Sequence, residues 1–117
     1  MTFANMADRD AIEAEMPFAE RDLPKTTWGL LGKTAAAHSA RKALTFQLLS
    51  DDGAKEETFT WGQLRDRTAQ TANLFRSLGG GETDVVADLL PNCNEAVQTY
   101  LGGQVAGRVL PINPLME

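Results

Sequence analysis

Several places along the chain carry residues whose types or spacing could do chemistry. The glycine-rich stretch from Gly102 to Arg108 has two glycines at the spacing of a phosphate-binding loop. Such a loop ends in Gly-Lys-Ser/Thr and lies between a strand and a helix. Here Arg108 and Val109 occupy the last positions, and the stretch falls at the end of a predicted helix. The sequence therefore favours a packing role, in which glycine permits a close approach to a sheet.

The run Gly79-Gly80-Gly81 is a second glycine-rich candidate. A dinucleotide-binding loop follows a strand and opens a helix. These glycines follow a predicted helix and precede a predicted strand, which is the reverse order. The sequence favours a connector that ends the helix.

The chain has one histidine and one cysteine, and neither has catalytic partners nearby in the sequence. His38 lies near the end of a predicted helix, where a solvent-facing or capping role is favoured. Cys93 follows Pro91-Asn92 at a predicted helix start, a location that can activate a thiol. No partner base is visible for it. One cysteine and one histidine also cannot build a transition-metal site of the usual kind.

Acidic residues supply the remaining candidates. The pairs Asp51-Asp52 and Glu56-Glu57 sit in or beside a predicted turn and are expected to be solvated. Asp88 is different, because it interrupts the apolar run at 85–90. A buried, unpaired carboxylate costs several kcal/mol, so Asp88 must reach water or a partner. It could lie at a sheet margin or a cavity, or else line a substrate tunnel or contact another part of the protein. The sequence assigns no catalytic, cofactor-binding or metal-binding residue.

Composition places the chain among ordinary globular proteins. Its 117 residues suffice for one domain, and 43% of them are hydrophobic and 23% charged. The net charge of -5 and the scattered Lys and Arg argue against nucleic-acid binding. The chain contains no run of about 18 apolar residues, so the sequence predicts no transmembrane helix. The polar stretch from Met1 to Glu15 does not resemble a signal peptide. The single cysteine fits a reducing cytoplasm.

The first half of the chain predicts an arm, a helix and a hairpin. Residues 1–25 form an acidic arm that Pro17 and Pro24 interrupt, with a short helical turn around 7–15. Trp28 to His38 has helical spacing, and Thr26 or Thr27 can cap its start. Two segments that read as strands, Ala43–Leu49 and Glu57–Thr60, flank turn residues and predict a β-hairpin over 43–60.

The second half predicts a long helix. Trp61 to Leu78 begins with the capping-box spacing of Thr60 and Gln63 and ends at the glycine run. Its apolar stripe consists of Trp61, Leu64, Thr68, Ala72, Phe75 and Leu78.

A strand, a helix and a second strand follow. The apolar run Val85–Leu90 precedes a helix that Asn92 can cap and that Gly107 ends. A second apolar run, 109–112, comes next. This order predicts a right-handed parallel βαβ unit. The residues expected to face inward from its helix are Ala96, Val97, Tyr100, Leu101 and Val105.

Two of five motifs along the chain resemble the core motifs of adenylate-forming enzymes. The stretch 59–64 is similar to the first core motif, in which Thr or Ser and an aromatic residue precede x-Glu-Leu. This chain has Trp61 for the commoner Tyr and Gln63 for Glu. The stretch 101–113 is similar to the second core motif, which runs Leu-x-x-x-Ala-Gly and ends Pro-Leu-Asn or Pro-Ile-Asp.

Three shorter stretches complete the resemblance. Residues 78–86 resemble Leu-Gly-x-Gly-x-Gly-Asp-x-Val, with Thr83 in place of the last glycine. Leu90-Pro91-Asn92 matches the Leu-Pro-Asn that usually follows. Residues 43–46 resemble the opening Pro-Ala-Leu-Thr-Phe, with Lys42 where Pro is common. Five motifs in this order are far more specific than any one of them.

The resemblance covers residues 26–114 and points to the acyl-CoA synthetases, with fatty-acyl-CoA synthetase-like members the most similar. It implies that the α/β fold, a β-hairpin plus a right-handed parallel βαβ unit, is a partial N-terminal portion of the family's large domain. The implied division is an N-terminal arm over 1–25 and a truncated AMP-binding domain over 26–117.

The resemblance also implies the chemistry of a parent enzyme. Such enzymes use ATP and Mg²⁺ to convert a carboxylate, here expected to be a fatty acid, to an acyl-adenylate with release of pyrophosphate. Coenzyme A then displaces AMP. In the family, the phosphate-binding loop with its Lys, the nucleotide-binding motifs and the catalytic Lys lie downstream of the stretch present here. We therefore expect no cofactor in this chain and no ligase activity from it alone.

Two other functions stay open at this stage. The chain could be a stand-alone α/β binding or interaction module, or a piece of an amino-acid adenylation domain. A reading frame that continues past Glu117 into a Thr/Ser/Gly-rich loop would favour the enzyme. Strand edges and apolar faces left open by a truncated sheet predict a homodimer or higher oligomer.

Overall fold

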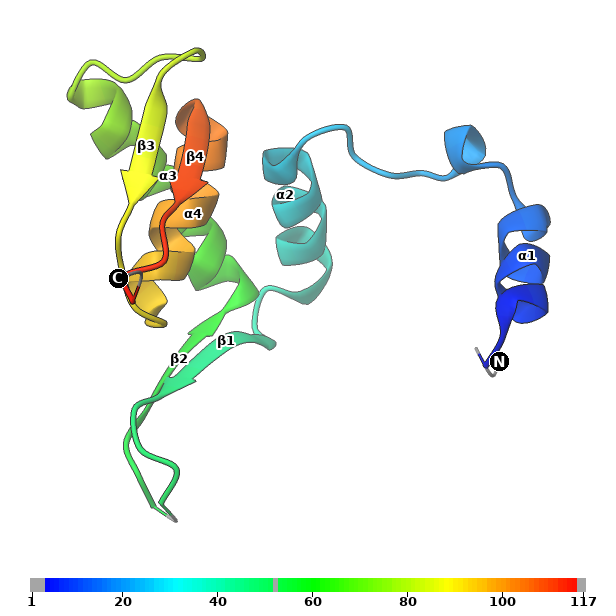
Figure 1. The fold of residues 1–117 in the computed structure, drawn as a ribbon, viewed down its shortest axis with the longest axis horizontal. Helices are drawn as coiled ribbons and strands as arrows, with labels where there is room; N and C mark the ends of the chain where they lie inside the picture. Colours follow the sequence, from blue (N-terminus) through cyan, green and yellow to red (C-terminus); the bar gives the residue numbers. More distant parts are fainter. Residues whose placement is uncertain (1–3, 52, 116–117) are drawn as a thin grey trace.

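A computed structural model describes residues 4–51 and 53–115. Three predictions lie partly outside these residues: the start of the arm, the turn and acidic pair that include Asp52, and the end of the proposed domain. The helices and strands run, in chain order, α1 (Met6–Glu15), a 3-10 turn (Phe18–Glu20), α2 (Thr27–His38), β1 (Lys42–Gln47), β2 (Glu56–Thr60), α3 (Trp61–Ser77), β3 (Val85–Asp88), α4 (Asn94–Ala106) and β4 (Arg108–Pro111), as Figure 1 shows.

The predicted hairpin is confirmed. Strands β1 and β2 pair antiparallel, with Gln47 opposite Glu56 at the turn end. The hydroxyls of Thr45 and Thr58 lie 2.9 Å apart across the pair. Such cross-strand pairs fix the register of a hairpin.

The predicted βαβ unit is also confirmed. Strands β3 and β4 pair in parallel, with Val86 opposite Val109 and Asp88 opposite Pro111. Helix α4 connects them, as a parallel pair requires. In Figure 1 the two strands lie side by side in front of α4.

Helix α4 is held close to both neighbours by its glycines. A Cβ atom at Gly102 would lie 2.6 Å from the Cβ of Thr71 on α3. A Cβ atom at Gly103 would lie 3.1 Å from the Cβ of Val109 on β4. Because Gly102 and Gly103 have no side chains, α4 can pack closely between α3 and the strands. The buried hydrophobic residues among the described ones are Leu31, Ala35, Leu64, Ala72 and Ala106.

The prediction of which α4 residues face inward was largely wrong. The buried positions of the helix are Asn94, Gly102, Gly103 and Ala106. Tyr100 is exposed, and the other four expected residues are only half-buried. Small residues, rather than large apolar ones, define the contact face because the helix packs closely against elements on two sides. On α3, the central stripe is buried as predicted, but Leu78 lies beyond the helix and is exposed.

Side-chain caps start two of the helices as predicted. The Thr26 hydroxyl accepts from the Gly29 N–H at 3.0 Å. On α3, Thr60 and Gln63 form the full capping box, with distances of 2.9 and 3.3 Å. The predicted cap of α4 by Asn92 is wrong. The N-cap there is Cys93, which makes no capping hydrogen bond through its side chain, and Asn92 is exposed.

Two glycines end helices in different ways. Gly79 follows α3 with φ of +92°, the left-handed conformation that glycine adopts without strain. Gly107 follows α4 in an extended conformation, and a side chain there would strike the carbonyl oxygen of Gly81. Its role is close approach between the end of α4 and the loop before β3.

The N-terminal arm stands apart from the rest of the chain (Figure 1). Helix α1 has no buried residue. The Arg21 guanidinium donates to the carbonyls of Ile12 and Met16 and so satisfies the C-terminal end of α1. The arm meets α2 through an ion pair of 2.5 Å between Lys33 and Asp22.

Candidate functional site

The glycine-rich stretch 102–108 does not form a phosphate cradle. The space in front of each of its three glycines is filled by protein: by Thr71 at Gly102, by Val109 at Gly103 and by the 81–84 backbone at Gly107. A phosphate must approach open backbone N–H groups. These glycines therefore serve packing, as the sequence favoured.

The run Gly79-Gly80-Gly81 is equally unsuited to an anion. The N–H of Gly79 donates to the Arg76 carbonyl, and that of Gly80 to the Phe75 carbonyl. The N–H of Gly81 donates to the Asp84 carboxylate at 2.7 Å. All three donors are thus used within the chain, and a carboxylate stands where a phosphate would bind. Neither glycine-rich stretch therefore fits the triphosphate of ATP.

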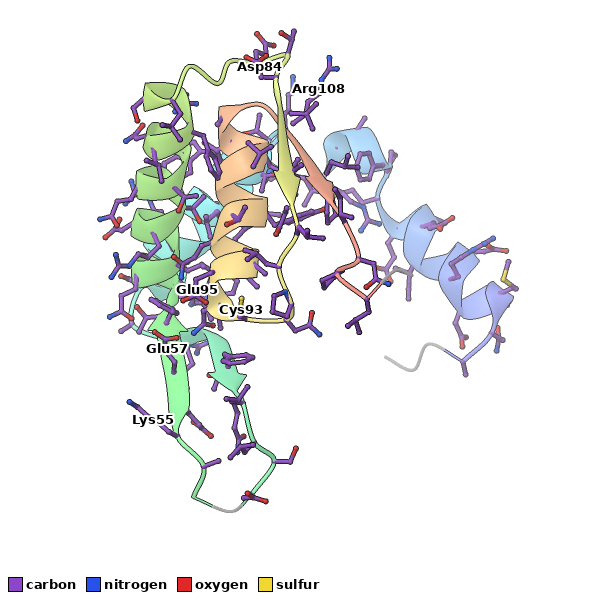
Figure 2. All side chains as sticks on the ribbon, turned by 60° about the vertical axis from the view of Figure 1, so that its left-hand side comes forward. Lys55, Glu57, Asp84, Cys93, Glu95 and Arg108 are labelled. Atoms are coloured by element: carbon purple, nitrogen blue, oxygen red, sulfur yellow. The ribbon has the colours of Figure 1, made fainter. Side chains whose placement is uncertain are left out.

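Asp84 has a structural role in this region. Its backbone oxygen accepts from the Arg108 N–H at 3.0 Å, which begins the pairing of β3 with β4. Figure 2 shows Asp84 and Arg108 together at the end of the sheet where both strands start. Asp84 therefore closes the glycine loop and aligns the two strands.

His38 and Cys93 stay isolated from one another. His38 is exposed in the last turn of α2, in agreement with a solvent-facing role. Cys93 is a half-buried free thiol at the start of α4, with Glu95 beside it in Figure 2. Across residues 4–51 and 53–115, no group of three His, Cys, Asp or Glu side chains could hold a metal ion.

Sequence reasoning missed Asn94, the first residue of α4. This side chain is 1% exposed, and its amide nitrogen donates to the Glu57 carboxylate on β2. The bond ties the hairpin to the βαβ unit. Glu57 is exposed as expected, but it is not merely solvated. The amide oxygen of Asn94 has no partner among the described residues. A polar residue at a helix start looks like an ordinary surface position in the sequence, so no signal pointed to this contact.

Asp88 is the most unusual acidic residue in the structure. Only 7% of it is exposed, although it stands at the end of β3. Its Oδ1 atom is buried and has no hydrogen-bond partner in the described part of the chain. The expectation that Asp88 would reach a partner is therefore not met for this oxygen. Asp88 lines a cavity, one of the placements considered from the sequence.

That cavity is an open hollow of about 290 Å³ at the carboxyl ends of β3 and β4. This is the edge at which parallel sheets bind ligands. We call it the Asp88 hollow. It is lined by Asp88, Leu90, Asn92, Ala96, Val97, Tyr100, Leu101, Pro111 and Ile112.

A second hollow, of about 600 Å³, separates α2 from α3. The Arg65 guanidinium lies over the Trp28 ring there, 5.5 Å from its centroid. Lys33 and Asp66 also line it, so basic, acidic and aromatic side chains are mixed in one open groove. This mixture specifies no single kind of ligand.

The described helices include none that combines the length and the apolar character needed to cross a membrane.

Comparison with known proteins identifies the family to which the chain is similar. Residues 31–117 match the family described as AMP-binding enzyme. Over 114 residues, 96% of this chain, the sequence is 31% identical to the marinolic acid–CoA ligase of Pseudoalteromonas. Over 52 residues it is 42% identical to the probable acyl-activating enzyme 21 of Arabidopsis thaliana. The matches span 17% and 10% of these two relatives, so the chain covers a small part of their length.

Solved structures share the fold. A fatty acid AMP ligase from Legionella pneumophila superposes with a TM-score of 0.69 and 25% identity, over 80% of this chain and 16% of that one. A fatty acyl-adenylate ligase from the same organism, in complex with acyl adenylate and pyrophosphate, gives 0.68 over 78% and 16%. An anthranilate CoA ligase gives 0.69 at 19% identity, which supports the fold alone.

Proposed function

The chain belongs to the AMP-binding enzyme family, and from this premise we propose that it is the N-terminal part of an AMP-forming acyl-CoA synthetase. The observation that carries the proposal is the family match over 31–117, on the parallel βαβ unit and the helices that pack on it. Within that enzyme, residues 26–117 would form the start of the large domain, and residues 1–25 an arm that precedes it.

The proposed reaction is the activation of a carboxylic acid. ATP and Mg²⁺ would convert the acid to an acyl-adenylate, and coenzyme A would then take the acyl group as a thioester. Support comes from relatives whose names state an acid–CoA ligase and an acyl-activating enzyme. A fatty acid is the proposed substrate class, because two structural neighbours are titled as ligases of fatty acids or their adenylates.

The chain itself is proposed to be scaffold. We assign it no catalytic, cofactor-binding or metal-binding residue, and we expect it to have no ligase activity alone. The packed glycines at 102–108 and the occupied N–H groups at 79–81 support this assignment. Residues outside this stretch would have to supply the site for the nucleotide.

Location and partners follow from the same proposal. We place the enzyme in the cytoplasm, because the single thiol fits a reducing compartment. Nucleic acid is not a proposed partner of a chain with net charge -5. The alternatives, a stand-alone module and an amino-acid adenylation domain, gain no support from relatives named as acid ligases.

The reading frame provides the first test. We expect the gene to continue past Glu117 into a Thr/Ser/Gly-rich loop that ends in Lys, because a phosphate cradle must come from there. A natural stop codon directly after Glu117 would contradict the proposal and favour the stand-alone module.

A further inference from the structure

The last residues of the N-terminal arm already lie along one wall of the open groove between α2 and α3. Pro24 packs on α2 where Gly29 has no side chain, and a Cβ atom there would lie 3.1 Å from the Cβ of Pro24. One turn further along α2, the Lys33 ammonium donates to the backbone oxygen of Asp22 at 2.7 Å and pairs with its carboxylate. Gly29 and Lys33 both line the groove of about 600 Å³. The contact between the arm and the groove has therefore begun.

The rest of the arm is a separate unit that can turn relative to these contacts. The Arg21 guanidinium donates to the carbonyl oxygens of Ile12 and Met16, which ties the 3-10 turn to the end of α1. The backbone N–H of Arg21 also donates to the Phe18 carbonyl at 3.2 Å. Hydrogen bonds within the arm thus hold residues 6–21 together, whereas α2 holds the residues that follow. Rotation of the backbone next to Arg21 turns the whole unit, as at a hinge.

Apolar side chains of this unit are exposed close to the hinge. Phe18 is 78% exposed and Met16 is 45% exposed, so the burial of either side chain would be favourable. Phe18 lies four residues before Asp22, a separation that an extended chain spans in roughly 14 Å. Beyond Lys33 the groove ends at Ser39, about 9 Å further along α2. Phe18 can therefore reach this part of the groove while the ion pair stays in place.

The mixed chemistry of the groove suits a protein segment better than a small ligand. Ala36 on α2 and Gly62 on α3 are small wall residues, beside which an aromatic ring can lie. The walls carry two cations, Lys33 and Arg65, and one acid, Asp66, whose carboxylate lies 3.4 Å from the Arg65 guanidinium. The arm is acidic, with six Asp and Glu residues against three Lys and Arg residues. The charges of the arm and of the groove are therefore complementary.

We propose that residues 6–22 are a strap that closes over the groove between α2 and α3 of the same chain. The structure shows the open arrangement, in which the ion pair between Asp22 and Lys33 holds one end of the strap (Figure 1). On closure, the unit turns about Arg21 and Phe18 comes to lie between the two helices. The tether keeps this arm at a high local concentration, so it occupies the groove ahead of the arm of a second copy. Because the held end is an exposed ion pair, salt opens the strap.

Paramagnetic broadening of amide NMR signals in the 117-residue chain tests closure. The substitutions Glu13→Cys and Cys93→Ser together allow a nitroxide to be attached to α1 alone. We expect the signals of Ala36 and Gly62 to lose roughly half of their intensity, because the strap is closed for part of the time. About 1 M salt, which shortens the Debye length to about 3 Å, should restore them. Full intensity at both residues in low salt would overturn the proposal.

A mixture of two chains shows whose arm fills the groove. One chain is isotopically labelled and carries no nitroxide, and the other carries the nitroxide without isotopes. We expect no broadening in this mixture, because the strap closes on its own chain. Broadening at Gly62 in the mixture would mean that the arm of a second copy occupies the groove, and it would overturn the proposal.

Two sets of variants test the contacts that hold the strap. Lys33→Glu should abolish the broadening, because like charges then meet at the held end, and Asp22→Lys in the same chain should restore it. Phe18→Ser should also abolish it, whereas Leu48→Ser, at a hairpin position that is 79% exposed, should not. Broadening that survives Lys33→Glu, or that both serine variants remove equally, would contradict the proposal. These outcomes involve neither ligase activity nor the reading frame, so the strap and the proposed function can fail separately.

Discussion

Single glycines determine how closely the helices of this chain pack. The glycine at 102 leaves no room for a Cβ, which would lie 2.6 Å from side-chain atoms of Thr71. The glycine at 32, within α2, has no neighbouring atom within 4 Å of that position. The two sites share a helical conformation and differ only in surroundings, so they form a matched pair.

We expect Gly102→Ala to destabilise the chain and Gly32→Ala to stabilise it. Alanine favours a helix over glycine by about 1 kcal/mol, and this gain should appear at 32. At 102 the clash costs about 1–3 kcal/mol and should exceed the gain. Urea denaturation of both variants measures the difference. A Gly102→Ala chain as stable as Gly32→Ala would show that α3 and α4 are not in close contact.

The ion pair between Asp22 and Lys33 lowers the pKa of the exposed Asp22 carboxyl group. The hydrogen bond from Lys33, together with its positive charge, lowers the pKa of Asp22 below the ordinary aspartate value. Because the folded pKa is depressed, any stability from the pair is present above the unfolded pKa and is lost as pH falls through the folded pKa. The pair is solvent-exposed, so its contribution to stability is small.

We expect Lys33→Met to return the pKa of Asp22 toward its ordinary value. NMR titration of the Asp22 carboxyl measures this directly. Lys25→Met is the control, because Lys25 makes no ion pair with a described residue. An Asp22 pKa that is equal in all three chains would mean that the arm does not meet α2 in solution.

For single residues, the sequence predicted the role of a side chain better than it predicted which residues surround that side chain. His38 was expected to face solvent, and it does. The glycines at 102 and 103 were expected to serve packing, and their neighbours confirm it. The burial of Asp88 and the contact of Asn94 were not predicted, because both depend on elements that are distant in sequence. The pattern of apolar and polar residues along one strand does not indicate which other elements pack on that strand.

At the scale of elements, the bond between Asn94 and Glu57 connects two substructures. It joins α4 to the hairpin, and the Asn94 side chain is fully buried at that junction. Removing a buried hydrogen-bonded amide leaves its former partner without that bond. Asn92 lies two residues earlier, is exposed and is not the cap of α4, so it offers a control of the same type.

We expect Asn94→Ala to lower the free energy of unfolding by about 1–3 kcal/mol. Asn92→Ala should change it by less than about 0.5 kcal/mol, as for most surface positions. Urea denaturation of the two variants is the measurement. A larger loss from Asn92→Ala would restore Asn92 as the cap of α4 and contradict the structure.

Elements with local signals were predicted well. The capping box at Thr60 places the start of α3, and the turn residues near 53 predict the hairpin. The start of α4 was misplaced because Asn92 has the chemistry of a cap but the chain turns one residue later. The inward face of α4 was misjudged for a different reason. Large apolar residues usually mark a core, but close packing between two neighbours selects glycine and alanine instead.

At the scale of the whole molecule, much apolar surface is left open. Leu89, which follows β3, is 62% exposed, and Leu115, beyond β4, is 85% exposed. Parallel sheets are normally covered on both faces. In this sheet, however, Val85 on β3 and Leu110 on β4 are both exposed. Each large apolar side chain left in water forgoes roughly 1.5–3 kcal/mol of burial. The two-stranded sheet also has unpaired edges that can accept another strand.

We therefore expect the isolated chain to form a homodimer or a higher oligomer that buries residues from 85–115. Light scattering during size-exclusion chromatography at micromolar concentration decides this. A single species with a mass near 12.7 kDa would refute the expectation.

The sequence predicted much of the fold of the described residues, and the assembly stays a prediction. The change from apolar runs to helical spacing predicted the hairpin and the parallel unit, and both are present. The prolines and charges of residues 1–25 predict an arm, and this division of the chain stays a prediction; helix α1 buries no residue.

Acid-dependent release of pyrophosphate tests the central claim most directly. The assay contains a fatty acid, ATP, Mg²⁺ and coenzyme A, and it compares the 117-residue chain with the product of the complete reading frame. We predict release from the complete product only, because we propose that this chain is scaffold and that the phosphate cradle lies elsewhere in the enzyme. Release by the 117-residue chain above a blank without protein, or none from the complete product with any acid tested, would contradict the account.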